Sequence, residues 1–147
     1  MPYRSIVCGV TGSTHAQKAA LEAAVLAKEN NAKLTYVYAV DIGFLRSGIT
    51  IQLSSGFAED SLMHLGSHIL DHAAKLAESQ GVSAKQVVRK GPVLDVLRAV
   101  VSEEQADLLV LGHEERTFFE KAFFKGEVED HVQELTQQTG TEVTIVR

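Results

Sequence analysis

The sequence lacks several features that mark specialised classes of protein. Its 147 residues include one cysteine and two prolines. No stretch approaches about 18 consecutive apolar residues, the length that suggests a membrane-spanning helix. A single cysteine, Cys8, cannot form an internal disulfide, and its apolar surroundings predict a small buried side chain. The N-terminus also lacks the apolar core and cleavage site of a secretory signal, so we expect a reducing, cytoplasmic location.

Positively charged residues are also fewer than negatively charged ones. The chain has 14 Lys and Arg against 19 Asp and Glu, for a net charge of −5, and its cations are scattered along the sequence. Nucleic-acid binding needs a basic patch, so neither a nucleic-acid partner nor a membrane partner is expected. The content of 45% hydrophobic and 22% charged residues is that of an ordinary globular protein. We therefore assign one domain, residues 1–147.

Hydrophobic periodicity predicts five strands alternating with four helices. Strands are expected at 5–10, 33–40, 84–89, 107–111 and 142–146, and helices at 15–30, 57–80, 92–105 and 127–138. Several strands are apolar on both faces, which favours an α/β fold with a single doubly wound parallel sheet flanked by helices. The predicted core-facing positions of the first three helices are Ala20, Ala23, Ala24 and Ala27; then Leu62, Leu65, Ile69, Ala73 and Leu76; then Val93, Val96, Leu97, Val100 and Val101.

Ligands of such sheets bind beyond the carboxyl ends of the strands, where the winding reverses. The loops that follow the first and fourth strands, 11–14 and 112–126, are therefore the first candidates for a site. Thr11, Ser13 and His15 lie close together in sequence, but a serine at a helix start is typically an N-cap. No Walker-type phosphate loop and no convincing acid and base pair are present, so we expect no enzyme activity and no catalytic residues.

The order of elements closely resembles that of the universal stress protein family over essentially the whole chain. The resemblance rests on VCGVTGST after the first strand, on TEVTIVR at the end, and above all on the unit that runs from Gly91-Pro92 through Ala106-Asp107 to Gly112. It implies a flavodoxin-like sheet, also described as adenine nucleotide alpha hydrolase-like, with strand order 3-2-1-4-5. It also implies a homodimer formed through the last strand, with these residues at its centre: Val143, Thr144, Ile145 and Val146.

Family members that bind ATP carry a loop after the fourth strand with the form Gly, two residues, Gly, nine residues, Gly, then Ser or Thr. Glycines let backbone N–H groups approach the phosphates, and the hydroxyl lies at a helix N-terminus, which attracts anions. This sequence keeps Gly112 and Gly126. Glu115 replaces the second glycine, ten residues separate it from Gly126, and Glu127 replaces the hydroxyl residue. By resemblance, the degenerate pocket consists of Thr11, which replaces an aspartate of binding members, with Ser13, Val40, Gly112, Gly126 and Glu127.

The loop is also rich in negative charge. Residues 112–130 contain six carboxylates and three cations, so a triphosphate would meet repulsion. The N-terminus of the expected last helix carries partial positive charge and attracts an anion. The chain itself could supply that anion, from the carboxylates of Glu127, Glu129 and Asp130. We therefore expect a dimeric stress-response or regulatory module, with no cofactor and without ATP binding. The alternative is an ATP or AMP binder with a divergent loop, since two glycines and three cations remain.

Two further patterns leave alternatives open. His64, His68 and His72 recur every four residues and could hold a metal ion, with Asp71 or Glu78 as helpers, which would make the chain a metal-binding module. The same row lies opposite the apolar stripe, where a solvated face is expected. Four aromatic residues in the loop could pack on the sheet or bind a protein partner: Phe118, Phe119, Phe123 and Phe124.

Overall fold

A computed structural model describes residues 3–10, 14–40, 55–112 and 140–146. These ranges form three helices and five strands. The helices are α1 (Thr14–Asn30), α3 (Ser55–Ser79) and α4 (Val93–Glu103). The strands are β1 (Ser5–Gly9), β2 (Lys33–Val40), β3 (Ala84–Lys90), β4 (Leu108–Gly112) and β5 (Glu142–Val146). All five predicted strands are confirmed to within one residue at each end, and the predicted helix at 127–138 lies outside the described residues.

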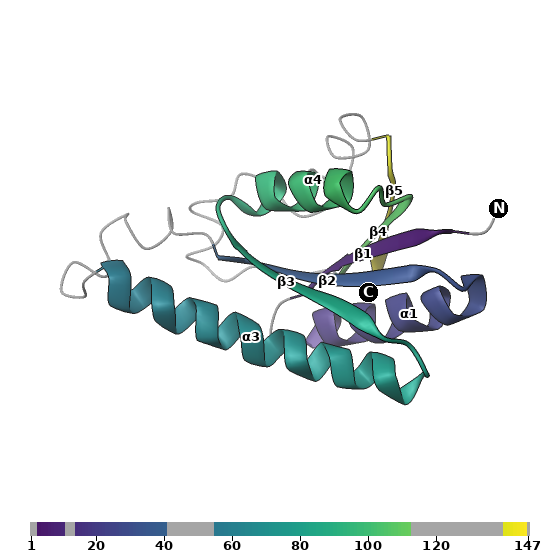
Figure 1. Cartoon of the computed structure of the whole chain (residues 1–147), viewed down its shortest axis with the longest axis horizontal. Coiled ribbons are helices and arrows are strands. Elements are labelled where there is room, and N and C mark those ends of the chain that lie inside the picture. Colours follow the sequence, from purple (N-terminus) through teal and green to yellow (C-terminus); the bar gives the residue numbers. More distant parts are fainter. Residues whose placement is uncertain (1–2, 11–13, 41–54, 113–139, 147) are drawn as a thin grey trace.

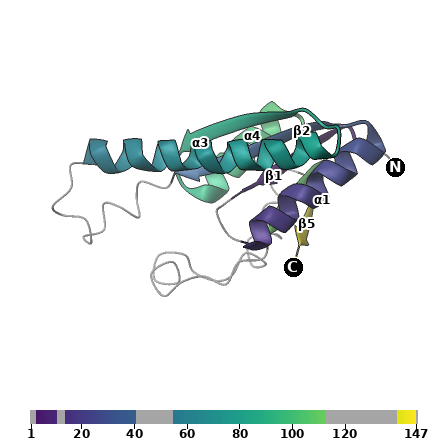
Figure 2. The ribbon, with the colours of Figure 1, turned by 90° about the horizontal axis from the view of Figure 1, so that it is seen from below.

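The strands form one sheet in which every neighbouring pair is parallel. Its order is β3-β2-β1-β4-β5, which confirms the order implied by the family resemblance. Helix α4 covers one face, whereas α1 and α3 lie side by side on the other (Figures 1 and 2). Parallel strands need crossover connections that lie on the faces of the sheet, and these helices supply the three that join β1, β2, β3 and β4 in chain order.

Alternation along the central strands produces a core on each face of the sheet. Successive side chains of a strand point to opposite faces. Ile6 and Cys8 therefore join the cluster under α1 and α3, whereas Val7 packs with Val37 and Leu109 under α4. This two-sided burial explains why β1 and β4 are continuous apolar runs.

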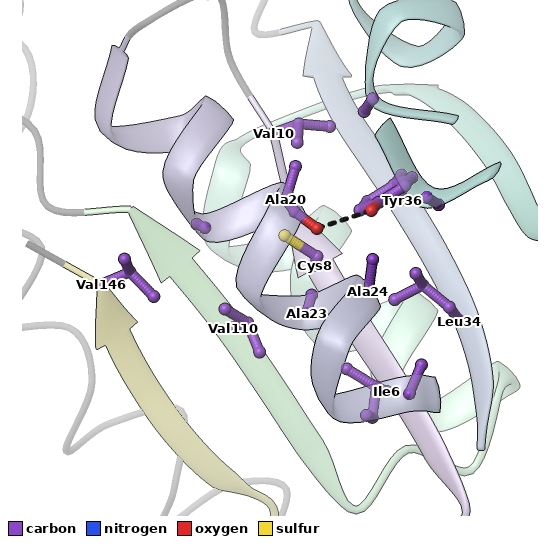
Figure 3. Close-up of a cluster of buried hydrophobic side chains, with 14 of the residues drawn as sticks. Ile6, Cys8, Val10, Ala20, Ala23, Ala24, Leu34, Tyr36, Val110 and Val146 are labelled. Carbon is purple, nitrogen blue, oxygen red and sulfur yellow. Dashed lines mark hydrogen bonds between the residues drawn. The ribbon is translucent and has the colours of Figure 1, made fainter. Parts of the chain in front are cut away.

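Helix α1 approaches the sheet closely because its inner face is made of alanines. The predicted stripe is confirmed, and Ala19 lies on the same buried face. Figure 3 shows Ala20, Ala23 and Ala24 of this helix beside Cys8 and Tyr36. The Tyr36 hydroxyl donates a 2.7 Å hydrogen bond to the carbonyl of Ala20, so the one polar atom of a fully buried ring is satisfied. Burial of Cys8 is likewise confirmed.

The buried face of α3 is rotated by about 70° from the predicted one, at about 100° per residue. Of the five predicted residues, Ala73 is buried and Ile69 packs against the core, whereas Leu62 and Leu76 are half-buried. The buried positions are Gly66, Leu70, Ala73 and Ala77, whereas Leu65 is 49% exposed. The reason is a close approach to β2. A Cβ atom at Gly66 would lie 2.6 Å from Cδ1 of Tyr38, so any larger residue would force the ring or the helix to move. A leucine there would collide with the ring, and Leu65 is turned toward solvent instead.

Helix α4 confirms four of its five predicted inward residues. Val96, Leu97, Val100 and Val101 are buried, but Val93 is 37% exposed. Val93 points in nearly the same direction as the other four at about 100° per residue, so its exposure reflects its place in the first turn. The helix begins one residue later than predicted, with Pro92 as its N-cap at a φ of −58°.

Candidate functional site

The carboxyl ends of the strands lie along one edge of the sheet. Val40 of β2 is in register with Lys90 of β3, and Gly112 of β4 is in register with Val146 of β5. Strand β1 lies between β2 and β4, so the winding of the chain reverses at the β1–β4 pair. This edge therefore has the geometry at which parallel α/β sheets bind ligands.

The floor of the sheet between β1 and β4 is filled by apolar side chains. Gly9, opposite Leu111, ends β1. A Cβ atom at Gly9 would lie 2.9 Å from Cδ2 of Leu111 and 3.2 Å from Cδ2 of Leu97. The two leucines thus close over the glycine. A polar ligand group would have to be held by residues beyond Val10 and Gly112.

Two of the six predicted pocket residues belong to the described part of the chain. Val40 is a buried residue at the end of β2, and its carbonyl accepts a 2.9 Å hydrogen bond from the N–H of Gly91. Gly112 is the buried last residue of β4. They lie on either side of β1 at the predicted edge. Thr11, Ser13, Gly126 and Glu127 lie outside the described residues, so the assembly of the pocket stays a prediction.

The buried ionisable groups near the middle of the sheet are chemically unreactive. Burial raises the pKa of the Cys8 thiol far above its ordinary value, so the sulfur stays protonated and is a poor nucleophile. Burial also raises the pKa of the Tyr36 hydroxyl, whose proton is already donated to Ala20. Neither group has the exposure that acid, base or nucleophilic catalysis requires.

A second polar cluster lies at the opposite, amino end of the strands. The carboxylate of Asp107 accepts hydrogen bonds from the N–H groups of Arg4, at 2.9 Å, and Ser5, at 3.1 Å. The Tyr3 hydroxyl donates a 2.7 Å hydrogen bond to Glu142, and this bond is the main cause of a raised pKa for Tyr3. Sequence reasoning missed these contacts, although the Asp that directly precedes β4 was a visible signal. They join the starts of β1, β4 and β5 and have a structural role.

Charged residues at the end of α4 are committed to ion pairs. Glu103 and Glu104 lie where the helix dipole is negative, an unfavourable position for carboxylates. Arg89 of β3 donates two hydrogen bonds to the carboxylate of Glu103, and this contact lowers the pKa of that carboxyl. Glu104 accepts from Lys85 at 2.6 Å and lies 3.9 Å from Nζ of Lys33. The strand cations therefore offset a local electrostatic conflict.

Strand β5 forms one end of the described sheet. Val146 is buried, whereas Val143, Thr144 and Ile145 are half-buried. Among the described strands, β5 pairs with β4 alone. Its outer edge consequently presents backbone N–H and C=O groups that another strand could pair with.

The predicted metal residues lie on an exposed surface of α3. His64, His68 and His72 are all exposed. Within the described ranges, no group of three or more His, Cys, Asp or Glu is arranged to hold a metal ion, so Asp71 and Glu78 do not complete a site. Phe118, Phe119, Phe123 and Phe124 lie outside the described residues. None of the helices described is long and apolar enough to cross a membrane.

Comparison with known proteins agrees with this fold. The model of the Universal stress protein family matches residues 2–147. Universal stress protein MJ0531 of Methanocaldococcus jannaschii is 28% identical over 120 residues, which cover 81% of this chain and 69% of that protein. UspA from Lactobacillus plantarum superposes with a TM-score of 0.79 at 19% identity, over 100% of this chain and 99% of that one. A universal stress protein crystallised in complex with cAMP gives a TM-score of 0.71 at 24% identity, over 100% of this chain and 98% of that one. The chain belongs to the universal stress protein family.

Proposed function

We propose that this chain is a dimeric stress-response or regulatory module that binds a partner instead of turning over a substrate, and that it does not bind ATP. Its location is cytoplasmic, in keeping with a lone buried thiol. The absence of enzyme activity is supported by the described ionisable groups. Buried Cys8 and Tyr36 are inert, and Glu103 and Arg89 are paired with each other.

The observation that carries the proposal is the replacement of phosphate-binding positions by glutamates. Gly112 ends β4 at the ligand-binding edge, and the loop that follows it has Glu115 and Glu127 where ATP-binding relatives have a glycine and a hydroxyl. A glutamate at a helix N-terminus occupies the favourable position for an anion and repels a second one. At Gly9 the neighbouring side-chain atoms are those of Leu97 and Leu111, so the described floor is apolar at that point.

The direct test compares the natural chain with a chain whose loop is restored. Equilibrium dialysis with labelled ATP should show no binding to the natural protein at micromolar concentration. In the double variant Glu115→Gly, Glu127→Ser, both repelling carboxylates are absent and the hydroxyl is present, so ATP affinity should rise. The variant Glu22→Gln changes charge on the exposed face of α1 and serves as the control. Micromolar ATP binding by the natural chain would disprove the proposal.

A second candidate function is binding of an adenine nucleotide with a single phosphate. A similar structure is described as a complex with cAMP, which carries one phosphate and needs fewer N–H donors than ATP does. The two glycines and three cations that remain in residues 112–126 could hold one phosphate. Titration with AMP and cAMP beside ATP separates the two candidates, because this alternative predicts binding of the monophosphates alone.

The dimer is proposed to form through β5. Its half-buried Val143, Thr144 and Ile145 flank an edge without a partner among the described strands. A second copy of β5, related by a two-fold axis, would pair with this edge and cover the apolar side chains. At the opposite edge, Lys85, Arg89 and Lys90 of β3 place charge along the strand, which disfavours pairing there.

A further inference from the structure

The exposed surface of α3 carries a row of imidazoles that the proposed function does not use. His64, His68 and His72 lie four residues apart on one continuous helix. No hydrogen bond or ion pair joins any of them to another residue in the described part of the chain. Residues four apart on a helix are neighbours, with Cβ atoms about 6 Å apart. Two consecutive imidazoles of the row can therefore reach the same small ion.

The row faces directly away from the sheet. At about 100° per residue, His68 points about 140 to 180° away from the four buried residues of the helix: Gly66, Leu70, Ala73 and Ala77. The histidines consequently contribute nothing to the core, which the opposite face of the helix contacts. A continuous helix holds the two residues at a fixed spacing, which reduces the entropy lost when an ion binds.

The arrangement sets the number of protein ligands at two. Three histidines in a straight row cannot converge on one ion, and no group of three or more potential ligands converges within the described residues. His68 belongs to both neighbouring pairs, so the row holds one ion at a time. Water or a ligand from another molecule would complete the coordination, as at open metal sites.

Charge distinguishes the two pairs. Asp60 lies one turn before His64 and is exposed on the same side, where its carboxylate attracts a cation. Near the other pair, Asp71 lies three residues after His68, but Lys75 lies four residues after Asp71 and three after His72, so its positive charge offsets that carboxylate. The pair nearer to Asp60 is therefore favoured over the pair nearer to Lys75.

We propose that His64 and His68 form a two-ligand surface site for a late first-row divalent cation. Imidazole nitrogen suits zinc, copper and nickel, whereas magnesium and calcium require oxygen ligands. The site lies on the outer face of α3 and shares no residue with the predicted nucleotide pocket. Its occupancy is therefore independent of whether the chain binds nucleotide.

The test is calorimetric titration of Zn²⁺ into the full-length, tag-free chain after treatment with a chelator. The natural protein should bind one zinc ion through this site. His68→Asn and His64→Asn should each weaken that binding by about tenfold or more, because the second imidazole acts as a ligand at high effective concentration. His72→Asn should leave the affinity within about threefold, since it does not touch the favoured pair. All three positions are exposed, and asparagine has a helix propensity close to that of histidine, so folding should not change.

The variants also control for the other three histidines, which are present in every protein tested. Equal zinc affinity in the natural chain and in His68→Asn would overturn the proposal, because the binding would then come from elsewhere. If His72→Asn lost zinc affinity while His64→Asn retained it, the assignment of the site to His64 and His68 would be overturned. Circular dichroism of each variant confirms that the helices remain intact.

Discussion

The hydroxyl of Tyr3 lies 2.7 Å from the carboxylate of Glu142, to which it donates a hydrogen bond across 139 positions of sequence. Tyr3 precedes β1, and Glu142 is the first residue of β5. Strand β4 lies between them, with Leu108 in register with both Ile6 and Glu142. The contact therefore ties the start of the chain to the strand that we propose forms the dimer interface.

Removal of the hydrogen bond between Tyr3 and Glu142 should make the free energy of unfolding less dependent on pH in the alkaline range. The hydrogen bond to Glu142 raises the pKa of Tyr3 above its ordinary value of 10.0, so its stabilisation is present below about pH 10 and is lost as the pH rises through the folded-state pKa. Tyr3→Phe should cost less than about 1 kcal/mol near neutral pH, since the bond is exposed. Urea unfolding from pH 8 to 11 measures both effects. A difference between natural protein and variant that stays constant across that range would contradict this account.

The pair of Arg89 and Glu103 should stabilise the fold at neutral pH and lose its effect in acid. Arg89 lowers the pKa of Glu103 below its ordinary value of 4.5. A lowered pKa means that the stabilisation is present above pH 4.5 and is lost as the pH falls through the folded-state value. In urea unfolding between pH 3 and 6, Glu103→Gln should therefore show a shallower pH dependence than the natural chain. Glu22→Gln on α1, which removes an exposed acid without such a contact, should keep the natural slope.

Gly66→Ala should destabilise the protein although alanine is the better helix former. In an open helix the substitution would stabilise by about 1 kcal/mol. Here the new Cβ would lie 2.6 Å from the Tyr38 ring, and relief of that overlap should cost about 1 to 3 kcal/mol. Ser67→Ala, at the next and exposed position of α3, should be neutral or slightly stabilising. A thermal unfolding temperature for Gly66→Ala at or above that of the natural chain would show that α3 does not pack closely on β2.

Charge on β5 should dissociate the proposed dimer. Ile145 is half-buried in the single chain, and a lysine there would place charge at the edge that a second β5 would cover. Light scattering at low micromolar concentration should give a dimer for the natural chain and a monomer for Ile145→Lys. Gln86→Lys introduces the same residue at an exposed position of β3, the opposite edge strand, and should leave the dimer intact. A natural chain that is monomeric under these conditions would rule out the interface.

Much of the fold could be predicted from local pattern because the pattern follows directly from burial on two faces. The continuous apolar runs of β1 and β4 indicated covered strands, and the alanine stripe indicated the close approach of α1. Strand order could not be derived this way, since pairing is a long-range property, and it came from family resemblance. The inner face of α3 was predicted only in part: Ala73 is buried as expected, but Leu65 is exposed, and Gly66 lies against the Tyr38 ring in its place.

The candidate site was predictable in position and less so in detail. The reversal of winding at β1 and β4 follows from the sheet order, and Val40 and Gly112 lie at the expected edge. The apolar floor at Gly9 depends on Leu97 of α4, more than 80 positions away in sequence, and no local pattern predicts that contact. The contacts of Asp107 with Arg4 and Ser5 were missed for the same reason.

The most direct test of the account is calorimetric titration of the natural, tag-free chain with ATP at near-neutral pH. Because the sequence has Glu115 and Glu127 where the family resemblance implies a glycine and a hydroxyl residue for phosphate binding, we predict no saturable heat at micromolar ATP. A dissociation constant in the micromolar range would contradict the central claim, because it would show that the loop after Gly112 still holds a triphosphate.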